Sequence, residues 1–188
     1  MEVRRDFYLD KLIKRKNNGL IKVITGIRRC GKSYLLNNLF YHHLLESGVA
    51  ADHIIRFAFD SADDLYRIGE SLIGIEKEKR GADPEKFMAY VRTKVVDNKM
   101  YYLLLDEIQM LDCFEAVLNS YLRKDNMDVF VTGSNAKLLS KDIATEFAGR
   151  GDEVHMYPLS FAEFMSVYEG DKYMGLSEYM LYGGIPLV

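Results

Sequence analysis

Short runs of apolar residues alternate along the chain with longer segments in which apolar and polar residues mix at helical spacing. Such runs, rich in Val, Ile, Leu, Phe and Tyr, predict β-strands, and the mixed segments predict helices. The predicted strands cover residues 20–25, 53–60, 100–105, 128–132 and 153–157. The predicted helices cover residues 33–46, parts of 62–98, 113–124 and 159–168. This alternation predicts an α/β fold, with a mainly parallel five-stranded sheet between two layers of helices.

Local signals refine this outline at three places. The run 100–105 is apolar throughout, as expected for a strand that is buried on both faces. Residues 76–84 are strongly charged and end in proline, so we expect a surface loop there. Ser160 and Glu163 have the spacing of a capping box and predict the start of the last helix.

A phosphate-binding motif lies between the first predicted strand and the first predicted helix. Residues 26–33 read Gly-Ile-Arg-Arg-Cys-Gly-Lys-Ser, which matches G-x-x-x-x-G-K-[ST] in full. Gly26 and Gly31 permit the turns and the close backbone approach that such a loop needs. We expect Lys32 to reach the β- and γ-phosphate oxygens, Ser33 to ligate Mg²⁺, and the helix dipole to favour the anion. The residues expected to bind ATP are Gly26, Ile27, Arg28, Arg29, Cys30, Gly31, Lys32, Ser33 and Tyr34.

A pair of carboxylates, Asp106 and Glu107, follows the continuous apolar strand about 75 residues after the phosphate loop. An aspartate at a strand tip is the second ligand position for Mg²⁺ in phosphate-loop sites, so we expect Asp106 to hold the metal. A carboxylate one residue further on can polarise an attacking water, and we therefore expect Glu107 to act as the catalytic base.

The fourth predicted strand leads into Ser134 and Asn135, at the sheet edge where ligands of open α/β sheets bind. Either side chain could position the attacking water or contact the γ-phosphate. The alternative is that Ser134 caps a helix over residues 135–139, and the two roles are compatible.

Arg150 lies on a turn between two glycines, just before the fifth predicted strand. From such a turn a guanidinium could reach the γ-phosphate as an arginine finger, either in the same chain or from a neighbouring subunit. The alternative is an exposed turn residue with no role in the site.

Composition limits the class of protein. Apolar residues make up 48% and charged residues 28% of 188, which is ordinary for a soluble globular domain. The sequence holds no run of 18 uncharged apolar residues and no apolar segment after its start, so we expect neither a membrane span nor export. With only Cys30 and Cys113, reduced thiols in a cytoplasmic protein are the simplest interpretation.

Charge is spread unevenly along the chain. The first 32 residues carry ten Lys or Arg and three Asp or Glu, a net charge of +7, so with a total of −3 the remainder carries −10. A basic N-terminal segment could contact nucleic acid. We favour a solvated helix face over residues 11–16, followed by residues that meet phosphates.

Several of these segments together resemble the AAA-type ATPase domain of a large prokaryotic family, and the resemblance covers essentially the whole chain. In that family the Asp-bearing strand is separated from the phosphate-loop strand, and a C-terminal domain of unknown function usually follows. The resemblance thus implies an ATPase domain over residues 1–168 and, over 169–188, the start of a truncated following region. The segments that carry it are 26–33, 103–109, 131–139, 148–150, 158–164 and 183–186.

The sequence therefore favours Mg²⁺-dependent ATP hydrolysis by an AAA-like motor or switch. A non-hydrolysing ATP-dependent switch or DNA-associated scaffold remains open, and a phosphate-loop kinase is less favoured because Glu107 adjoins Asp106. No Asn-Lys-x-Asp segment follows the fourth strand, which argues against a GTPase. A homo-oligomer and a nucleic-acid or protein partner also remain open.

Overall fold

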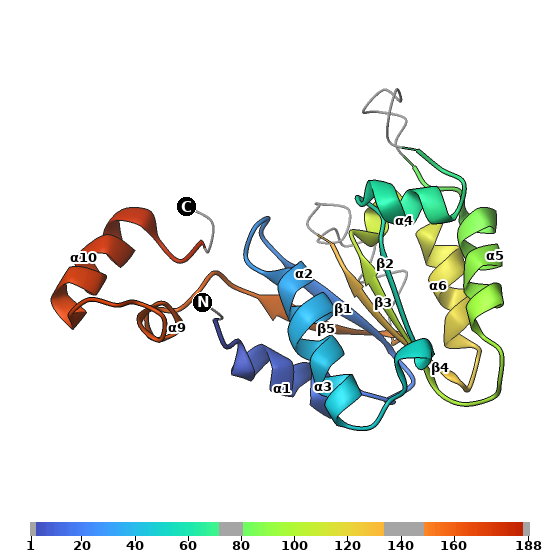
Figure 1. Ribbon diagram of the computed structural model, residues 1–188, viewed down its shortest axis with the longest axis horizontal. Coiled ribbons are helices and arrows are strands. Elements are labelled where there is room, and N and C mark those ends of the chain that lie inside the picture. The colour runs from blue at the N-terminus through green and yellow to red at the C-terminus, as the bar shows by residue number, and fades with distance from the viewer. Residues whose placement is uncertain (1–2, 72–80, 134–148, 186–188) are drawn as a thin grey trace.

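The computed structural model describes residues 3–71, 81–133 and 149–185, and it contains one five-stranded sheet (Figure 1). The strand order is β2-β3-β4-β1-β5, and every neighbouring pair is parallel. β4 thus separates β3 from β1, as the family resemblance implies. The strands are β1 (Ile21–Gly26), β2 (Ile54–Ala58), β3 (Tyr101–Asp106), β4 (Met127–Thr132) and β5 (Gly151–Met156).

The three central strands are buried at every position, which explains why most of their residues are apolar. Alternate side chains of β3 enter two different cores: Leu103 and Leu105 face one, Leu104 faces the other. Helices cover both faces, so the predicted three-layer α/β/α architecture is confirmed. The first core packs on α4 (Ala62–Arg67), α5 (Pro84–Lys94) and α6 (Phe114–Leu122). The second core packs on α1 (Asp6–Arg15) and the helical stretch after β1.

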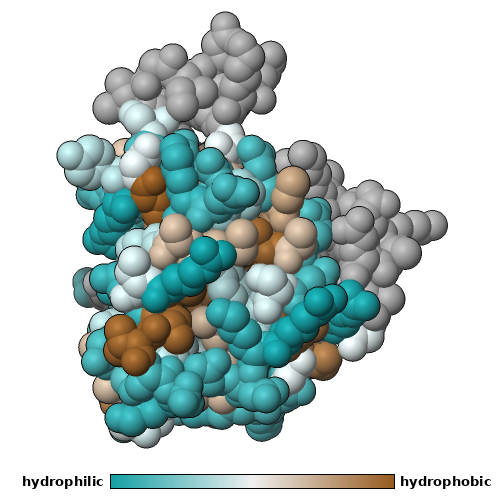
Figure 2. All heavy atoms as spheres, turned by 90° about the vertical axis from the view of Figure 1, so that its right-hand side faces the viewer, coloured by the Kyte–Doolittle hydropathy of each residue, from teal (hydrophilic) through white to brown (hydrophobic). Residues whose placement is uncertain are grey.

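The helical stretch after β1 is continuous but not uniform. It consists of α2 (Lys32–Tyr34), the π-helical segment η1 (Leu35–Phe40) and α3 (Tyr41–Glu46). Short 3₁₀ turns, η2 (Ala51–His53) and η4 (Ile108–Met110), precede β2 and follow β3. The side of the molecule at the right of Figure 1 is mainly hydrophilic, with small separate hydrophobic patches (Figure 2).

The predicted loop over 76–84 needs one correction, because Pro84 is the first residue of α5. Asp83 caps this helix by accepting from the backbone N–H groups of Glu85, at 2.8 Å, and Lys86, at 3.4 Å. Proline suits the first helical position, since its missing N–H has no intrahelical partner there. Residues 76–80 lie outside the described part of the chain.

Two helices follow β5 and lie beside the sheet (Figure 1). The predicted capping box starts α9 (Phe161–Met165), with the Ser160 N–H 2.8 Å from Glu163 Oε2. α10 (Lys172–Tyr182), which the sequence did not indicate, packs on α9 through the ring of Tyr179. The boundary predicted after residue 168 falls between these helices and stays a prediction.

After these two helices the chain returns to Leu159, which lies just before α9. The Leu159 N–H donates to the Gly184 carbonyl at 2.7 Å, and the Tyr179 hydroxyl donates to the Leu159 carbonyl at 2.7 Å. A Cβ on Gly184 would overlap the backbone of Leu159. α10 carries exposed apolar side chains, among them Tyr173 at 82% and Met180 at 78% of full exposure.

None of the helices in the described ranges combines the length and the apolar character that a membrane span requires.

A histidine held between two carboxylates fixes the start of β2. His53 Nδ1 lies 2.7 Å from Asp52 Oδ1, and Nε2 lies 3.2 Å from both carboxylate oxygens of Asp97. The ring stacks on Tyr101 with 4.5 Å between centroids. Hydrogen bonding to Asp52, and then to Asp97, raises the pKa of His53 above its ordinary value of 6.5.

Folding should therefore stabilise the protonated imidazole. This contribution is fully present below the ordinary pKa and is lost as pH rises through the raised folded-state pKa. We expect the thermal unfolding midpoint of wild type to fall more steeply than that of His53→Gln as the pH rises above the ordinary histidine pKa of 6.5. His42→Gln, at an exposed position, should keep the wild-type slope. Equal slopes for wild type and His53→Gln would contradict the assignment.

Candidate functional site

The loop that joins β1 to α2 has the backbone that its two glycines were expected to provide. Gly26 has φ of 140° and Gly31 has φ of 98°, values that side chains with a Cβ rarely adopt. A Cβ on Gly26 would also overlap the carbonyl oxygen of Met156 on β5. The predicted phosphate loop thus packs directly against the neighbouring strand, at the carboxyl end of the sheet.

Lys32 lies back across this loop. Its Nζ donates to the carbonyl oxygens of Gly26, at 3.0 Å, and Ile27, at 2.9 Å, and the residue is buried. The ammonium group therefore lies inside the curve of the loop, where a phosphate chain would be wrapped. Ser33 follows at the start of the helix and is exposed.

Asp106, at the end of β3, lies within hydrogen-bonding distance of side chains from two other elements. Its carboxylate accepts from Ser33 and Asn37 of the helical stretch, the latter at 3.2 Å, and from Thr132 at the end of β4. Burial raises the pKa of Asp106, and the hydrogen bonds from Thr132 and Ser33 oppose this shift. The structure thus brings together the two residues, Ser33 and Asp106, expected to hold Mg²⁺.

A hydroxyl and a carboxylate fit magnesium, which is usually bound through one or two protein oxygens together with water and phosphate oxygens. Within the described ranges, no three His, Cys, Asp or Glu side chains form a metal-binding group of their own. A cation at this site would accordingly depend on phosphate oxygens for the rest of its ligands.

Glu107 occupies the turn that follows β3, with φ of 51° and ψ of 50°. Its backbone N–H donates to the Thr132 hydroxyl at 3.1 Å, and its carboxylate accepts from the Gln109 amide. A left-handed conformation in a residue other than glycine costs about 1–3 kcal/mol, and such conformations cluster at functional sites. Thr132 and Gln109 hold this conformation, so both belong to the site although neither was among the predicted site residues.

Arg150 lies at the amino-terminal ends of the strands, whereas the phosphate loop lies at their carboxyl ends. Its carbonyl accepts from the Ile21 N–H at 2.9 Å, at the start of β1, whereas the phosphate loop begins at the end of that strand. At about 3.3 Å per residue the two ends of β1 are about 17 Å apart. Arg150 Nη1 instead donates to Asn119 Oδ1 on α6, at 3.2 Å. Arg150 is therefore far from the phosphate loop of its own chain, because β5 runs parallel to β1 and Arg150 precedes it, and its expected role as a finger stays a prediction.

Ser134 and Asn135 lie outside the described residues, so their expected roles stay predictions. The strand that leads to them ends at the site, since Thr132 contacts both Asp106 and Glu107.

The basic N-terminal helix is partly neutralised and partly buried. Arg15 pairs with Asp152 of β5 at 2.7 Å, while Tyr8 and Leu12 pack into the second core. Arg5, which precedes the helix, is only 2% exposed.

Comparison with known proteins identifies related sequences and structures. The model of the AAA domain family matches residues 18–165. An uncharacterised protein of Haemophilus influenzae is 35% identical over 192 residues, which cover 99% of this chain and 44% of that protein. The uncharacterised protein MJ1544 of Methanocaldococcus jannaschii is 28% identical, over 98% of this chain and 38% of its own length. The chain thus spans less than half the length of these curated relatives.

Solved structures share the fold at low sequence identity. The Walker-type ATPase paby2304 of Pyrococcus abyssi superposes with a TM-score of 0.65 at 16% identity, over 98% of this chain and 65% of that one. The Aeropyrum pernix ORC2 protein, in its ADPNP–ADP complexes, gives a TM-score of 0.53 at 17% identity, over 90% of this chain and 51% of that one. From its motifs, its sheet order and the family match, the chain belongs to the AAA domain family of phosphate-loop ATPases.

Proposed function

We propose that this chain binds Mg·ATP and hydrolyses it, as the ATPase module of a molecular motor or switch. The observation that carries the proposal is the meeting of Ser33 and Asp106 at the foot of the phosphate loop, with Glu107 directly after Asp106. Lys32 and the loop N–H groups would hold the phosphates, and Ser33 and Asp106 would hold the metal. Bound there, Mg²⁺ would neutralise charge on the β- and γ-phosphate oxygens.

In this proposal Glu107 accepts a proton from the attacking water, and the Thr132 hydroxyl holds the Asp106 carboxylate and the Glu107 backbone N–H relative to each other. A kinase needs no such base next to its metal ligand, so the Asp106–Glu107 pair favours hydrolysis over phosphate transfer.

Phosphate release from ATP tests the proposal directly. It should require Mg²⁺ and stop when EDTA is added, and the assay should be run with and without double-stranded DNA. Binding of ATP without turnover, in either condition, would favour the alternative of a non-hydrolysing switch. Appearance of a phosphorylated acceptor in place of free phosphate would favour a kinase.

Replacing Lys32 should abolish tight nucleotide binding. Lys32→Ala removes a charge-assisted contact to phosphate of about 1.5–3 kcal/mol, so the affinity for ATP should fall at least about tenfold. Isothermal titration with Mg·ATP measures this change. Lys14→Ala, which removes an exposed lysine of α1, is the matched control and should bind as wild type does. Unchanged affinity of Lys32→Ala would refute the phosphate-loop assignment.

Replacing Glu107 should separate binding from hydrolysis. Glu107→Gln keeps the side-chain shape but removes the base, so it should bind Mg·ATP normally and turn over about 10²-fold more slowly. Single-turnover phosphate release measures the loss, with Glu85→Gln, at an exposed position on α5, as the control. Asp106→Asn should instead raise the Mg²⁺ concentration needed for half-maximal activity. Wild-type turnover by Glu107→Gln would exclude Glu107 as the base.

We propose that Arg150 acts as a finger on the ATP of a neighbouring subunit, since it lies far from the phosphate loop of its own chain. We then expect Arg150→Ala to bind ATP normally, to hydrolyse it as much as about 10³-fold more slowly, and to regain activity when mixed with Lys32→Ala protein. Asn119→Ala, which removes the hydrogen-bond partner of Arg150 but keeps the guanidinium, should retain activity. Undiminished turnover of Arg150→Ala would leave Arg150 as a turn residue only.

A further inference from the structure

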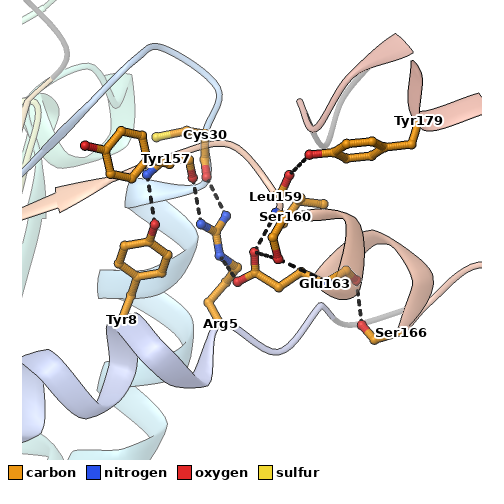
Figure 3. Close-up of polar contacts among 9 residues, drawn as sticks. All are labelled: Arg5, Tyr8, Cys30, Tyr157, Leu159, Ser160, Glu163, Ser166 and Tyr179. Carbon is orange, nitrogen blue, oxygen red and sulfur yellow. Dashed lines mark hydrogen bonds and ion pairs between the residues drawn. The ribbon is translucent and has the colours of Figure 1, made fainter. Parts of the chain in front are cut away.

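Arg5, just before α1, is surrounded by groups from three distant parts of the chain (Figure 3). Nη1 donates to the carbonyl of Cys30 in the phosphate loop at 3.0 Å, and Nη2 donates to the carbonyl of Tyr157 after β5 at 2.7 Å. Nε lies 2.9 Å from Glu163 Oε1 in an ion pair with α9. The guanidinium also lies over the ring of Tyr8, 4.7 Å from its centroid.

Burial on this scale is unusual for arginine and needs compensation. The side chain of Arg5 is only 3% exposed and that of Glu163 only 20% exposed. An arginine removed from water loses its hydration, and the loss is offset only if its donors and its charge are met. The two Nη atoms of Arg5 donate to two carbonyls, and Nε, which makes no hydrogen bond, is compensated by the charge of Glu163; the single ammonium of lysine cannot reproduce that fork.

The hydrogen bond from Arg5 to the Cys30 carbonyl also determines the direction of the Gly31 N–H, which belongs to the same peptide unit. The Cys30–Gly31 bond is trans, since the described residues contain no cis peptide bond. In a planar trans peptide the C=O and the following N–H point in opposite directions. Holding the Cys30 carbonyl toward Arg5 therefore turns the Gly31 N–H away from Arg5. Within the described part of the chain this N–H donates to no protein group.

We propose that Arg5 is a positioning residue of the phosphate loop, which orients the Gly31 N–H toward a bound phosphate through the Cys30–Gly31 peptide. The inference rests on the proposed binding of ATP by this loop. The charge of Arg5 also polarises the peptide unit that it contacts, which strengthens the donor on the far side. Arg5 itself does not touch the nucleotide.

Glu163 fixes the direction of the guanidinium. One of its carboxylate oxygens pairs with Arg5, while the other accepts from the Ser160 N–H at 2.8 Å and the Ser160 hydroxyl at 2.9 Å (Figure 3). The Tyr157 N–H, next to the second carbonyl held by Arg5, donates to the Tyr8 hydroxyl at 3.1 Å. The first turn of α9 is thereby linked to the phosphate loop through two side chains, Glu163 and Arg5.

Arg5→Lys tests the proposal because it keeps the charge and removes the fork. We expect the affinity for Mg·ATP to fall about tenfold, and the affinity for inorganic tripolyphosphate to fall by the same factor, since the lost contact acts on phosphate alone. Isothermal titration measures both ligands. Arg4→Lys, the same change at the exposed neighbouring residue, should alter neither affinity.

Glu163→Gln provides a second variant that should fold, because glutamine also completes a capping box. It removes the countercharge of Arg5 and should weaken both ligands in equal proportion, by less than Arg5→Lys does. In ¹⁵N-labelled protein, the Gly31 amide resonance should shift in both variants and stay unchanged in Arg4→Lys.

The outcomes separate this proposal from the function on which it rests. Wild-type affinity for both ligands in Arg5→Lys, or weaker ATP binding with unchanged tripolyphosphate binding, would overturn the role of Arg5. If wild-type protein binds neither ligand, the proposed nucleotide binding itself fails. If Lys32→Ala loses ATP while Arg5→Lys does not, only the positioning role is lost.

Discussion

Main-chain hydrogen bonds that pair β1, β4 and β3 in parallel carry three segments of the chain to one edge of the sheet. Each strand ends in a group of the site: Gly26 opens the loop, Thr132 closes β4, and Asp106 closes β3. β4 is the central member because it pairs with β1 on one side and β3 on the other, and its Thr132 contacts both the Asp106 carboxylate and the Glu107 backbone N–H. A one-residue shift in the β3–β4 register would turn Thr132 to the other face of the sheet and separate these groups.

The sequence predicted those parts of the structure that depend on residues close together in the chain. Three patterns each span only a few residues: the glycine spacing of the loop, the apolar run before Asp106 and the capping box of Ser160. Each pattern favours one local conformation for a known physical reason. The strand order was available only from the family resemblance. Asn37 could have been found as well, because it lies four residues after Ser33 on the same helix face.

The remaining parts depend on contacts between residues far apart in the chain. Arg5 meets Cys30, Tyr157 and Glu163 across 25, 152 and 158 positions, and no local pattern marks a lone arginine before a helix. For Arg150, in contrast, a local pattern pointed to the phosphate site, whereas the structure places the residue far from the phosphate loop of its own chain. Its glycine neighbours suggested a reach toward phosphate, but a residue that precedes a parallel strand must lie at the amino edge of the sheet. Strand direction, already implied by an all-parallel fold, places Arg150 away from the phosphate loop of its own chain.

The hydrogen bond between Leu159 and Gly184 gives α9 and α10 the character of an insertion. The chain departs after the end of β5 at Leu159 and returns to Leu159 at Gly184, so the segment between forms a loop whose two ends are joined by a hydrogen bond. The entropy of closing such a loop grows only slowly with its length. The part of this segment that follows Glu163 could therefore change in length without moving the partner of Arg5 or the point at which the chain meets Leu159 again, provided that glycine is kept at position 184.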